Sequence, residues 1–154
     1  MKLILSIMGC LLVVASVQAQ HPRKFDEYGN IRFSDEKARL YNLALQLQRE
    51  PTYVAYLIVY AGRKACVGEA RFRAVRAKNY LVNRGGIEAD RIIWVDAGHR
   101  EELTVELWAY PPWIGEPYIL ADVDKRDVQI IRNCSSKYKG RQRPFNRRAR
   151  LTTH

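Results

Sequence analysis

Two stretches of this 154-residue chain repeat their apolar positions with a helical period. The first begins with a hydroxyl residue and two acids, Ser34-Asp35-Glu36. This order is typical of a helix start, because free backbone amides accept a side-chain cap and the helix dipole favours negative charge there. The pattern predicts a helix over 35–49, ended by Pro51, with an apolar face made by Leu40, Leu43, Ala44 and Leu47.

The second helical stretch runs from about Gly68 to Asn83. Its apolar positions are mostly small side chains, so this helix can lie close to a sheet: Ala70, Ala74, Ala77 and Leu81. The sequence Arg-Gly-Gly follows. We expect Gly85 or Gly86 to end the helix in the left-handed conformation.

Three further stretches have the pattern of strands. Thr52–Tyr60 is apolar at both alternating sets of positions, which is typical of a central strand buried on both faces. Asp90–Asp96 is a second strand, and Leu103–Tyr110 is a third, with Glu106 on the alternation that we expect to face water. The short link between the last two predicts an antiparallel hairpin.

The strand pattern is weaker at the two ends of the predicted domain. Residues 20–33 hold a possible first strand, and residues 126–133, "RDVQIIRN", a possible edge strand. The order of elements is β-α-β-α-β-β. It predicts a fold of the α+β or α/β class, in which two helices pack on one face of a small mixed sheet.

The chain begins with a short positive start and a long apolar run that ends in Val17-Gln18-Ala19. This is the pattern of a secretory signal peptide, residues 1–19, cleaved near Ala19. We therefore expect an exported protein of the periplasm, outer membrane or another part of the cell envelope. After the signal peptide, the sequence predicts a domain over 20–112, an extension over 113–134 and a basic, disordered tail over 135–154.

Positive charge is concentrated at the C-terminal end. Residues 20–124 contain 15 Lys and Arg against 15 Asp and Glu, whereas residues 125–154 contain 10 against one, Asp127. A polyanionic partner would therefore bind the tail, where Tyr138 and Phe145 lie among the cations. Export makes nucleic acid a poor candidate, and anionic lipid or polysaccharide a better one.

Two cysteines remain after the predicted cleavage, Cys66 and Cys134. In an oxidising compartment they would form one disulfide, and the alternative is two unpaired thiols. A bridge requires Cα atoms about 4.4–6.8 Å apart.

The stretch "FRAVRAKNYLVNRGGIEADRI" resembles the C-terminal, peptidoglycan-binding domain family of OmpA. The family pattern is Arg-Ala, Tyr-Leu, Gly-Ile and a basic residue before Ile. Here it is met by Arg73-Ala74, Tyr80-Leu81, Gly86-Ile87 and Arg91-Ile92. The similarity extends from about Phe25 to Tyr110 and implies a compact, divergent member.

The resemblance also implies a ligand site. Family members hold the carboxylate and amine of diaminopimelate with the Arg of the Arg-Ala pair and an Asp at the end of the preceding strand. Arg73 corresponds to the Arg, but Gly62 stands in place of the Asp and Cys66 in place of a supporting Asn. The loop between them is also shorter by about four residues, so half of the clamp is missing.

Arg73 therefore has two interpretations. It binds a ligand carboxylate while Glu69 takes the ammonium, or it pairs with a carboxylate of the domain, Glu69 or Asp96, and is structural. The loop places Arg63 and Lys64 near Arg73 and Arg76. This grouping favours a purely anionic ligand over a zwitterion.

The sequence predicts a non-enzymatic envelope protein that binds peptidoglycan or an envelope protein weakly. The alternative is a secreted cationic protein whose tail binds anionic envelope polymers or lipid head groups. Cys66, His99 and Asp96 could in principle form a hydrolytic set, but no nucleophile motif surrounds Cys66. We predict no cofactor and no metal site.

Overall fold

The computed structural model describes residues 22–134, so the predicted signal peptide and basic tail lie outside it. Within this range a four-stranded sheet and a two-stranded sheet accompany two α-helices. The elements are β1 (Lys24–Tyr28), α1 (Phe33–Arg49), β2 (Val54–Ala61), β3 (Lys64–Cys66), α2 (Glu69–Asn83), β4 (Ile92–His99), β5 (Thr104–Tyr110) and β6 (Gln129–Ile131). Neither helix of the described part is long and apolar enough to cross a bilayer.

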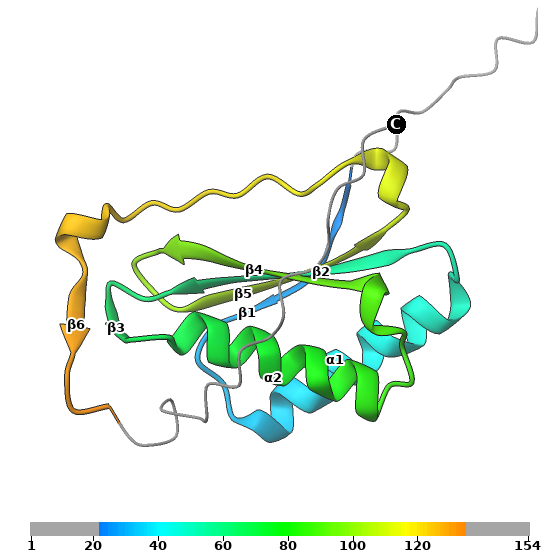
Figure 1. Ribbon diagram of the computed structural model, residues 1–154, viewed down its shortest axis with the longest axis horizontal. Coiled ribbons are helices and arrows are strands. Elements are labelled where there is room, and N and C mark those ends of the chain that lie inside the picture. Colours follow the sequence, from blue (N-terminus) through cyan, green and yellow to red (C-terminus); the bar gives the residue numbers. More distant parts are fainter. Residues whose placement is uncertain (1–21, 135–154) are drawn as a thin grey trace, which may run out of the picture.

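The predicted helices and strands are confirmed to within a few residues, and so is the fold class. Both helices lie on one face of the four-stranded sheet (Figure 1). Their predicted apolar faces are buried in one core with β2 and β5, and the small side chains Ala70, Ala74 and Ala77 are at most 3% exposed. These alanines let α2 lie close to the sheet.

The end of α2 is set by a left-handed glycine. Gly86 has φ +66°, and the amide of Ile87 donates to the carbonyl of Leu81 at 3.2 Å. Ile87 then enters the core. Arg91 binds the C-terminal end of α1, where it donates to the carbonyls of Leu47 and Glu50 at 2.8 and 2.9 Å.

The start of α1 differs from the prediction. The helix begins at Phe33 with Arg32 as its N-cap residue, and the hydroxyl of Ser34 donates to Asp35 at 3.1 Å instead of capping. The acids still lie in the first turn, where the helix dipole favours them. One of them, Glu36, is buried.

The predicted hairpin between the last two long strands is wrong. The sheet order is β1-β5-β2-β4, so β2 lies between β4 and β5. It pairs parallel with β4 and antiparallel with β5. A strand that is apolar on both faces, as β2 is, suits such a central position. The link from β4 to β5 crosses the end of β2, where the amide of Arg100 donates to Ala61 at 2.9 Å.

The face of β5 that was expected to be solvent-exposed is only partly so. Thr104 and Trp108 are half-buried, whereas Glu106 and Tyr110 are 2% and 4% exposed. The extension after β5 runs across this second face of the sheet (Figure 1), and the amide of Leu120 donates to the hydroxyl of Tyr60 at 3.1 Å. Glu106 is neutralised there by Lys24 at 2.9 Å and Arg100 at 3.0 Å.

The extension ends in the predicted edge strand, β6. Its partner is β3, a short strand that the pattern did not predict, and the two are parallel. The remaining short helices are η1 (Ala89–Arg91), η2 (Pro112–Ile114) and η3 (Lys125–Asp127).

Candidate functional site

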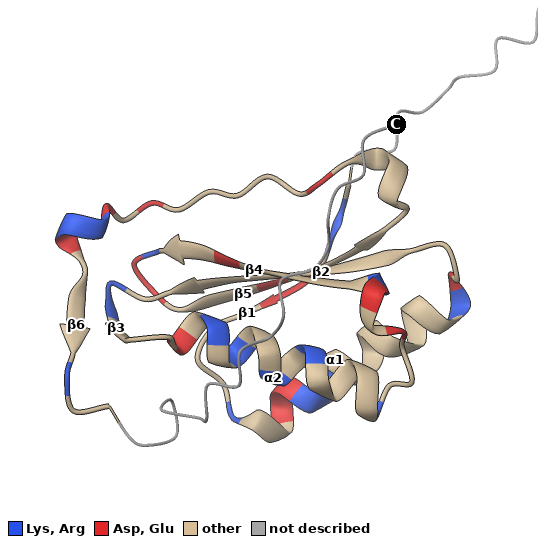
Figure 2. Ribbon diagram, in the orientation of Figure 1, with Lys and Arg blue, Asp and Glu red and all other residues tan. Residues whose placement is uncertain are grey.

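A groove of about 490 Å³ lies where β2 ends and α2 begins. The loop after β2 contributes Gly62, Arg63 and Lys64, and the turn before β5 contributes Glu101 and Glu102. The turn reaches the groove because it crosses the end of β2. Figure 2 shows the acidic turn beside the basic start of β3.

Arg73 does not line this groove. Arg73 is 5% exposed, and its guanidinium is held by two partners that do line the groove, Glu69 and Asn30. Nη2 donates to Asn30 Oδ1 at 2.7 Å and to Glu69 Oε1 at 3.0 Å, and Nε donates to the same carboxylate oxygen at 3.2 Å. The positive charge of Arg73 is therefore balanced inside the domain.

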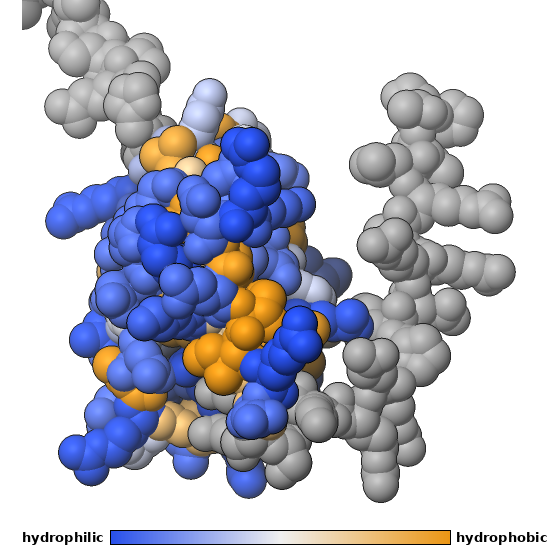
Figure 3. Space-filling view, turned by 90° about the vertical axis from the view of Figure 1, so that its left-hand side faces the viewer, coloured by the Kyte–Doolittle hydropathy of each residue, from blue (hydrophilic) through white to orange (hydrophobic). Residues whose placement is uncertain are grey.

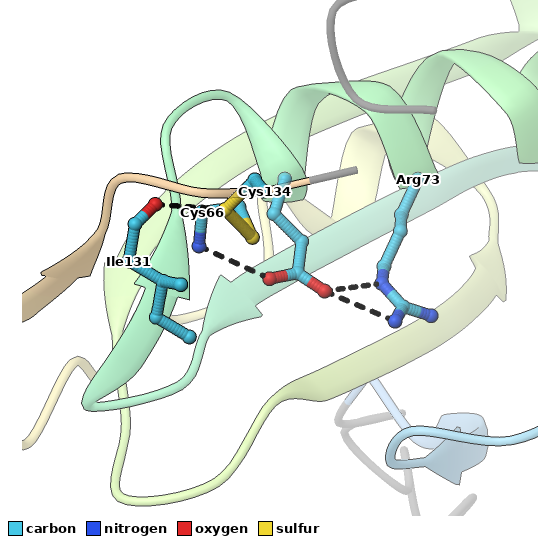
Figure 4. The surroundings of a disulfide bond; sticks show 5 residues. Cys66, Arg73, Ile131 and Cys134 are labelled. Atoms are coloured by element: carbon cyan, nitrogen blue, oxygen red, sulfur yellow. Dashed lines mark hydrogen bonds and ion pairs between the residues drawn. A yellow bond between two sulfur atoms is a disulfide. The ribbon is translucent and has the colours of Figure 1, made fainter. Parts of the chain in front are cut away.

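Glu69 connects Arg73 to the disulfide loop. Its second oxygen accepts from the amide of Cys66 at 3.4 Å, and this chain of contacts is drawn in Figure 4. Because both oxygens are engaged, the structure favours the structural interpretation of Arg73. The other acid considered, Asp96, is exposed on β4 and forms no ion pair with a described residue.

The four predicted cations are separated by their partners. Arg63 forms a two-pronged ion pair with Glu101, with Nε 2.7 Å from Oε2, and this contact lowers the pKa of Glu101. Arg76 pairs instead with the buried Glu36 of α1 and lies 4.4 Å from the ring centroid of Phe33. Only Arg63 and Lys64 line the groove.

The groove also holds charges that are not balanced internally. Lys64 and Glu102 are both exposed, and neither side chain forms an ion pair with a described residue. The other two acids in its wall, Glu69 and Glu101, are already paired with Arg73 and Arg63. The two unpaired charges are of opposite sign, so the purely anionic ligand stays a prediction, and Glu102 adds a charge that would attract an ammonium group.

Gly62 lies in close backbone contact with the turn before β5. A Cβ atom at this position would lie 3.2 Å from the backbone nitrogen of Leu103 and 3.4 Å from the carbonyl oxygen of Lys64. Any larger residue would have to displace the backbone of the turn that crosses β2. Glycine at this position therefore allows the loop and the turn to approach closely.

Cys66 and Cys134 form a disulfide, with Cα atoms 5.7 Å apart. The bridge joins the end of β3 to the segment after β6, and it decides between a disulfide and two free thiols in favour of the disulfide. The sulfur of Cys134 lies 2.8 Å from the carbonyl oxygen of Ile131 (Figure 4), but it has no proton to donate. Cys66 therefore provides no thiolate nucleophile.

Among residues 22–134, no cluster of three or more His, Cys, Asp or Glu side chains could hold a metal ion. Comparison with known proteins gave no match: no family model, no curated protein and no solved structure matches the chain.

Sequence reasoning did not assign Asn30 and Glu101 to the site. Asn30 precedes α1 by three residues, and Glu101 lies in a turn that was expected to close a hairpin. The sequence shows that Asn30 precedes a predicted helix and that Glu101 precedes a predicted strand. It does not show that the two residues line one groove, because that depends on the position of β2 in the sheet.

Proposed function

We propose that the chain is a non-enzymatic protein of the cell envelope whose OmpA-like domain binds peptidoglycan weakly through this groove. The observation that carries the proposal is the position and charge of the groove. It lies between the end of β2 and the start of α2, where the resemblance places the ligand, and it is lined by the unpaired charges of Lys64 and Glu102.

The order of elements supports the OmpA-like assignment, because a mixed sheet with two helices on one face is what the resemblance implies. In this proposal Arg73 does not contact the ligand but supports the residues of the groove wall. Glu69 and Asn30 hold it, and their own positions shape the groove wall.

The ligand would be a stem peptide of the wall, which carries both ammonium and carboxylate groups. Lys64 would attract the carboxylate, and Glu102 the ammonium. Because exposed ion pairs contribute little in water, we expect weak binding, in which each of the two residues changes the affinity by about fivefold at most.

The test is calorimetric titration of an oxidised chain of residues 20–134 with diaminopimelate and, separately, with sulfate. We expect diaminopimelate to bind more tightly, and Lys64→Ala and Glu102→Gln each to weaken it. Arg71→Ala is the matched control, because Arg71 is exposed on α2 and does not line the groove. Equal binding of the two ligands, or no effect of either groove variant, would contradict the proposal.

A second candidate function is favoured by the tail. Residues 135–154 contain seven Lys and Arg and no Asp or Glu. In that case the tail binds anionic envelope polymers and the domain is its carrier. Truncation after Cys134 removes the tail and keeps β6 and the disulfide. If the truncated chain no longer sediments with wall sacculi, whereas Lys64→Ala and Glu102→Gln still do, the tail is the binding element.

A further inference from the structure

The last described residues, 124–134, are attached to the domain but contribute nothing to its core. Val123 is the last buried residue of the described chain, and its amide donates to the carbonyl of His99 at 3.2 Å. Every residue that follows it, up to Cys134, is exposed or half-buried, and none belongs to either hydrophobic cluster. We call residues 124–134 the β6 segment. The core of the domain can therefore persist when this segment moves.

The β6 segment is held by a short backbone pairing and one covalent bond. β6 lies outside the four-stranded sheet and pairs with β3 alone, beside which it runs in Figure 1. The amide of Gln129 donates to the carbonyl of Arg63 at 2.8 Å, and the disulfide joins Cys134 to Cys66 at the end of β3. An isolated two-stranded pair is marginally stable at best in water. We therefore expect the disulfide to be the bond that keeps β6 on β3.

The side chains of β6 bury little surface. Ile130 is 50% exposed and Ile131 is 47% exposed. Figure 3 views the end of the molecule that carries β3 and β6, and apolar side chains remain visible there within a hydrophilic surface. Burial of apolar surface is the main contribution that fixes a strand to a domain. The pairing of β3 with β6 therefore lacks the packing that holds the four-stranded sheet together.

The β6 segment and the disulfide both reach the groove. Ile131 of β6 and Cys66 of β3 line it, whereas Ile130, on the opposite face of β6, does not. The amide of Cys66 also donates to Glu69, another residue of the groove wall, at 3.4 Å. Both cysteines are half-buried, so a dithiol can approach the bond from the open groove. Opening of the disulfide therefore acts directly on one wall of the groove.

We propose that the disulfide between Cys66 and Cys134 is a redox switch of the groove. Its reduction releases the β6 segment from β3 and takes Ile131 out of the groove wall, while the four-stranded sheet and both helices stay folded. The reductant is a protein dithiol. One of its thiolates attacks a sulfur of the bond and forms a mixed disulfide, and its second thiol then displaces the cysteine. The chain gains two thiols, and the dithiol becomes a disulfide.

The first test is amide hydrogen exchange, followed by NMR, of the chain of residues 20–154 before and after reduction with dithiothreitol. We expect the Gln129 amide to exchange about tenfold faster in the reduced chain, because its bond to Arg63 opens, while the amides of β2 stay protected. The variant Cys66→Ser/Cys134→Ser is the matched control. It should exchange as the reduced parent does, and dithiothreitol should not change it.

The second test measures the groove and rests on the proposed function. The oxidised chain should bind diaminopimelate about fivefold more tightly than the reduced chain, because a partly buried aliphatic side chain leaves the groove on reduction. Oxidised Ile131→Ser should bind as weakly as the reduced parent but keep the slow exchange of Gln129. Ile130→Ser is the control on the opposite face of β6, and it should bind as the oxidised parent does.

Slow exchange of Gln129 that survives reduction would overturn the proposal. Loss of protection throughout β2 would overturn it too, because the disulfide would then hold the whole domain and not the β6 segment alone. Equal binding of diaminopimelate by the oxidised and reduced chains would show that the bond does not control the groove. If the oxidised chain does not bind diaminopimelate, the proposed function fails, and faster exchange of Gln129 with β2 still protected continues to support release of the segment.

Discussion

The guanidinium of Arg73 is bound by the carboxylate of Glu69, one helical turn earlier on α2, with Nη2 3.0 Å from Oε1. Both side chains are nearly buried, at 6% and 12% exposure. A cation that the sequence offers as a ligand-binding group is therefore part of an internal contact that also reaches Asn30.

The first prediction concerns this contact. Arg73→Ala should lower the free energy of unfolding by about 2 kcal/mol, because Glu69 and Asn30 lose their partner while water still reaches the carboxylate. Urea denaturation measures the effect, with Arg71→Ala as the control on the same helix. A variant that unfolds like the parent but no longer binds diaminopimelate would show that Arg73 contacts the ligand.

The second prediction concerns Glu36, which is 1% exposed and accepts hydrogen bonds from Arg76 and from the hydroxyl of Tyr28. Arg76→Met should destabilise the domain by about 3 kcal/mol, because it leaves a buried carboxylate without its counter-charge. The double variant Glu36→Gln/Arg76→Met should recover part of this loss. If the double variant is less stable than Arg76→Met, the two residues are not coupled in this way.

The third prediction concerns the disulfide, which closes a loop with a sequence separation of 68 residues. In the chain-entropy model, opening a loop of this length lowers stability by about 4 kcal/mol at most. The variant Cys66→Ser/Cys134→Ser should therefore unfold at lower urea concentration than the oxidised parent. Adding a reductant should shift the parent toward the variant and leave the variant itself unchanged.

The fourth prediction concerns acid stability. Burial opposes the ionisation of Glu106, but the hydrogen bonds from Lys24 and Trp108 prevail and lower its pKa below the ordinary 4.5. A lowered folded pKa contributes stability that is complete above the unfolded value and is lost as the pH falls through the folded one.

Between neutral pH and the acid range, Glu106→Gln should therefore lose less stability than the parent does. Thermal unfolding followed across this range measures the difference. Glu102→Gln, an exposed carboxylate without an ion pair to a described residue, is the control and should keep the parent's pH dependence. An identical acid response in Glu106→Gln would contradict the assignment.

The residues that carry the family resemblance mainly hold the fold. Leu81 and Ile87 are in the core, Gly86 takes the left-handed turn after α2, and Arg91 binds carbonyls at the end of α1. The role of Gly86 is local and that of Leu81 follows from helical spacing, so both could be predicted from the sequence. The bonds of Arg91 join residues 41 and 44 positions apart and depend on the fold.

The sequence by itself determined the two helices, the central strand and the small-residue face of α2, because apolar periodicity and helix-ending glycines act over short distances along the chain. It also determined that positive charge gathers after residue 124. Only the tertiary structure decided that β2 lies between β4 and β5, since strand order depends on which faces bury the most apolar surface together.

Because β2 lies between β4 and β5, the turn that contains Glu101 and Glu102 crosses the end of β2 and forms a wall of the groove. In the same way, pairing of β3 with β6 brought Cys134 to Cys66. Contacts between residues about 40 to 70 positions apart are set by packing of the whole domain. For that reason Arg73 could be identified from the sequence, but its partners could not be fixed without the fold.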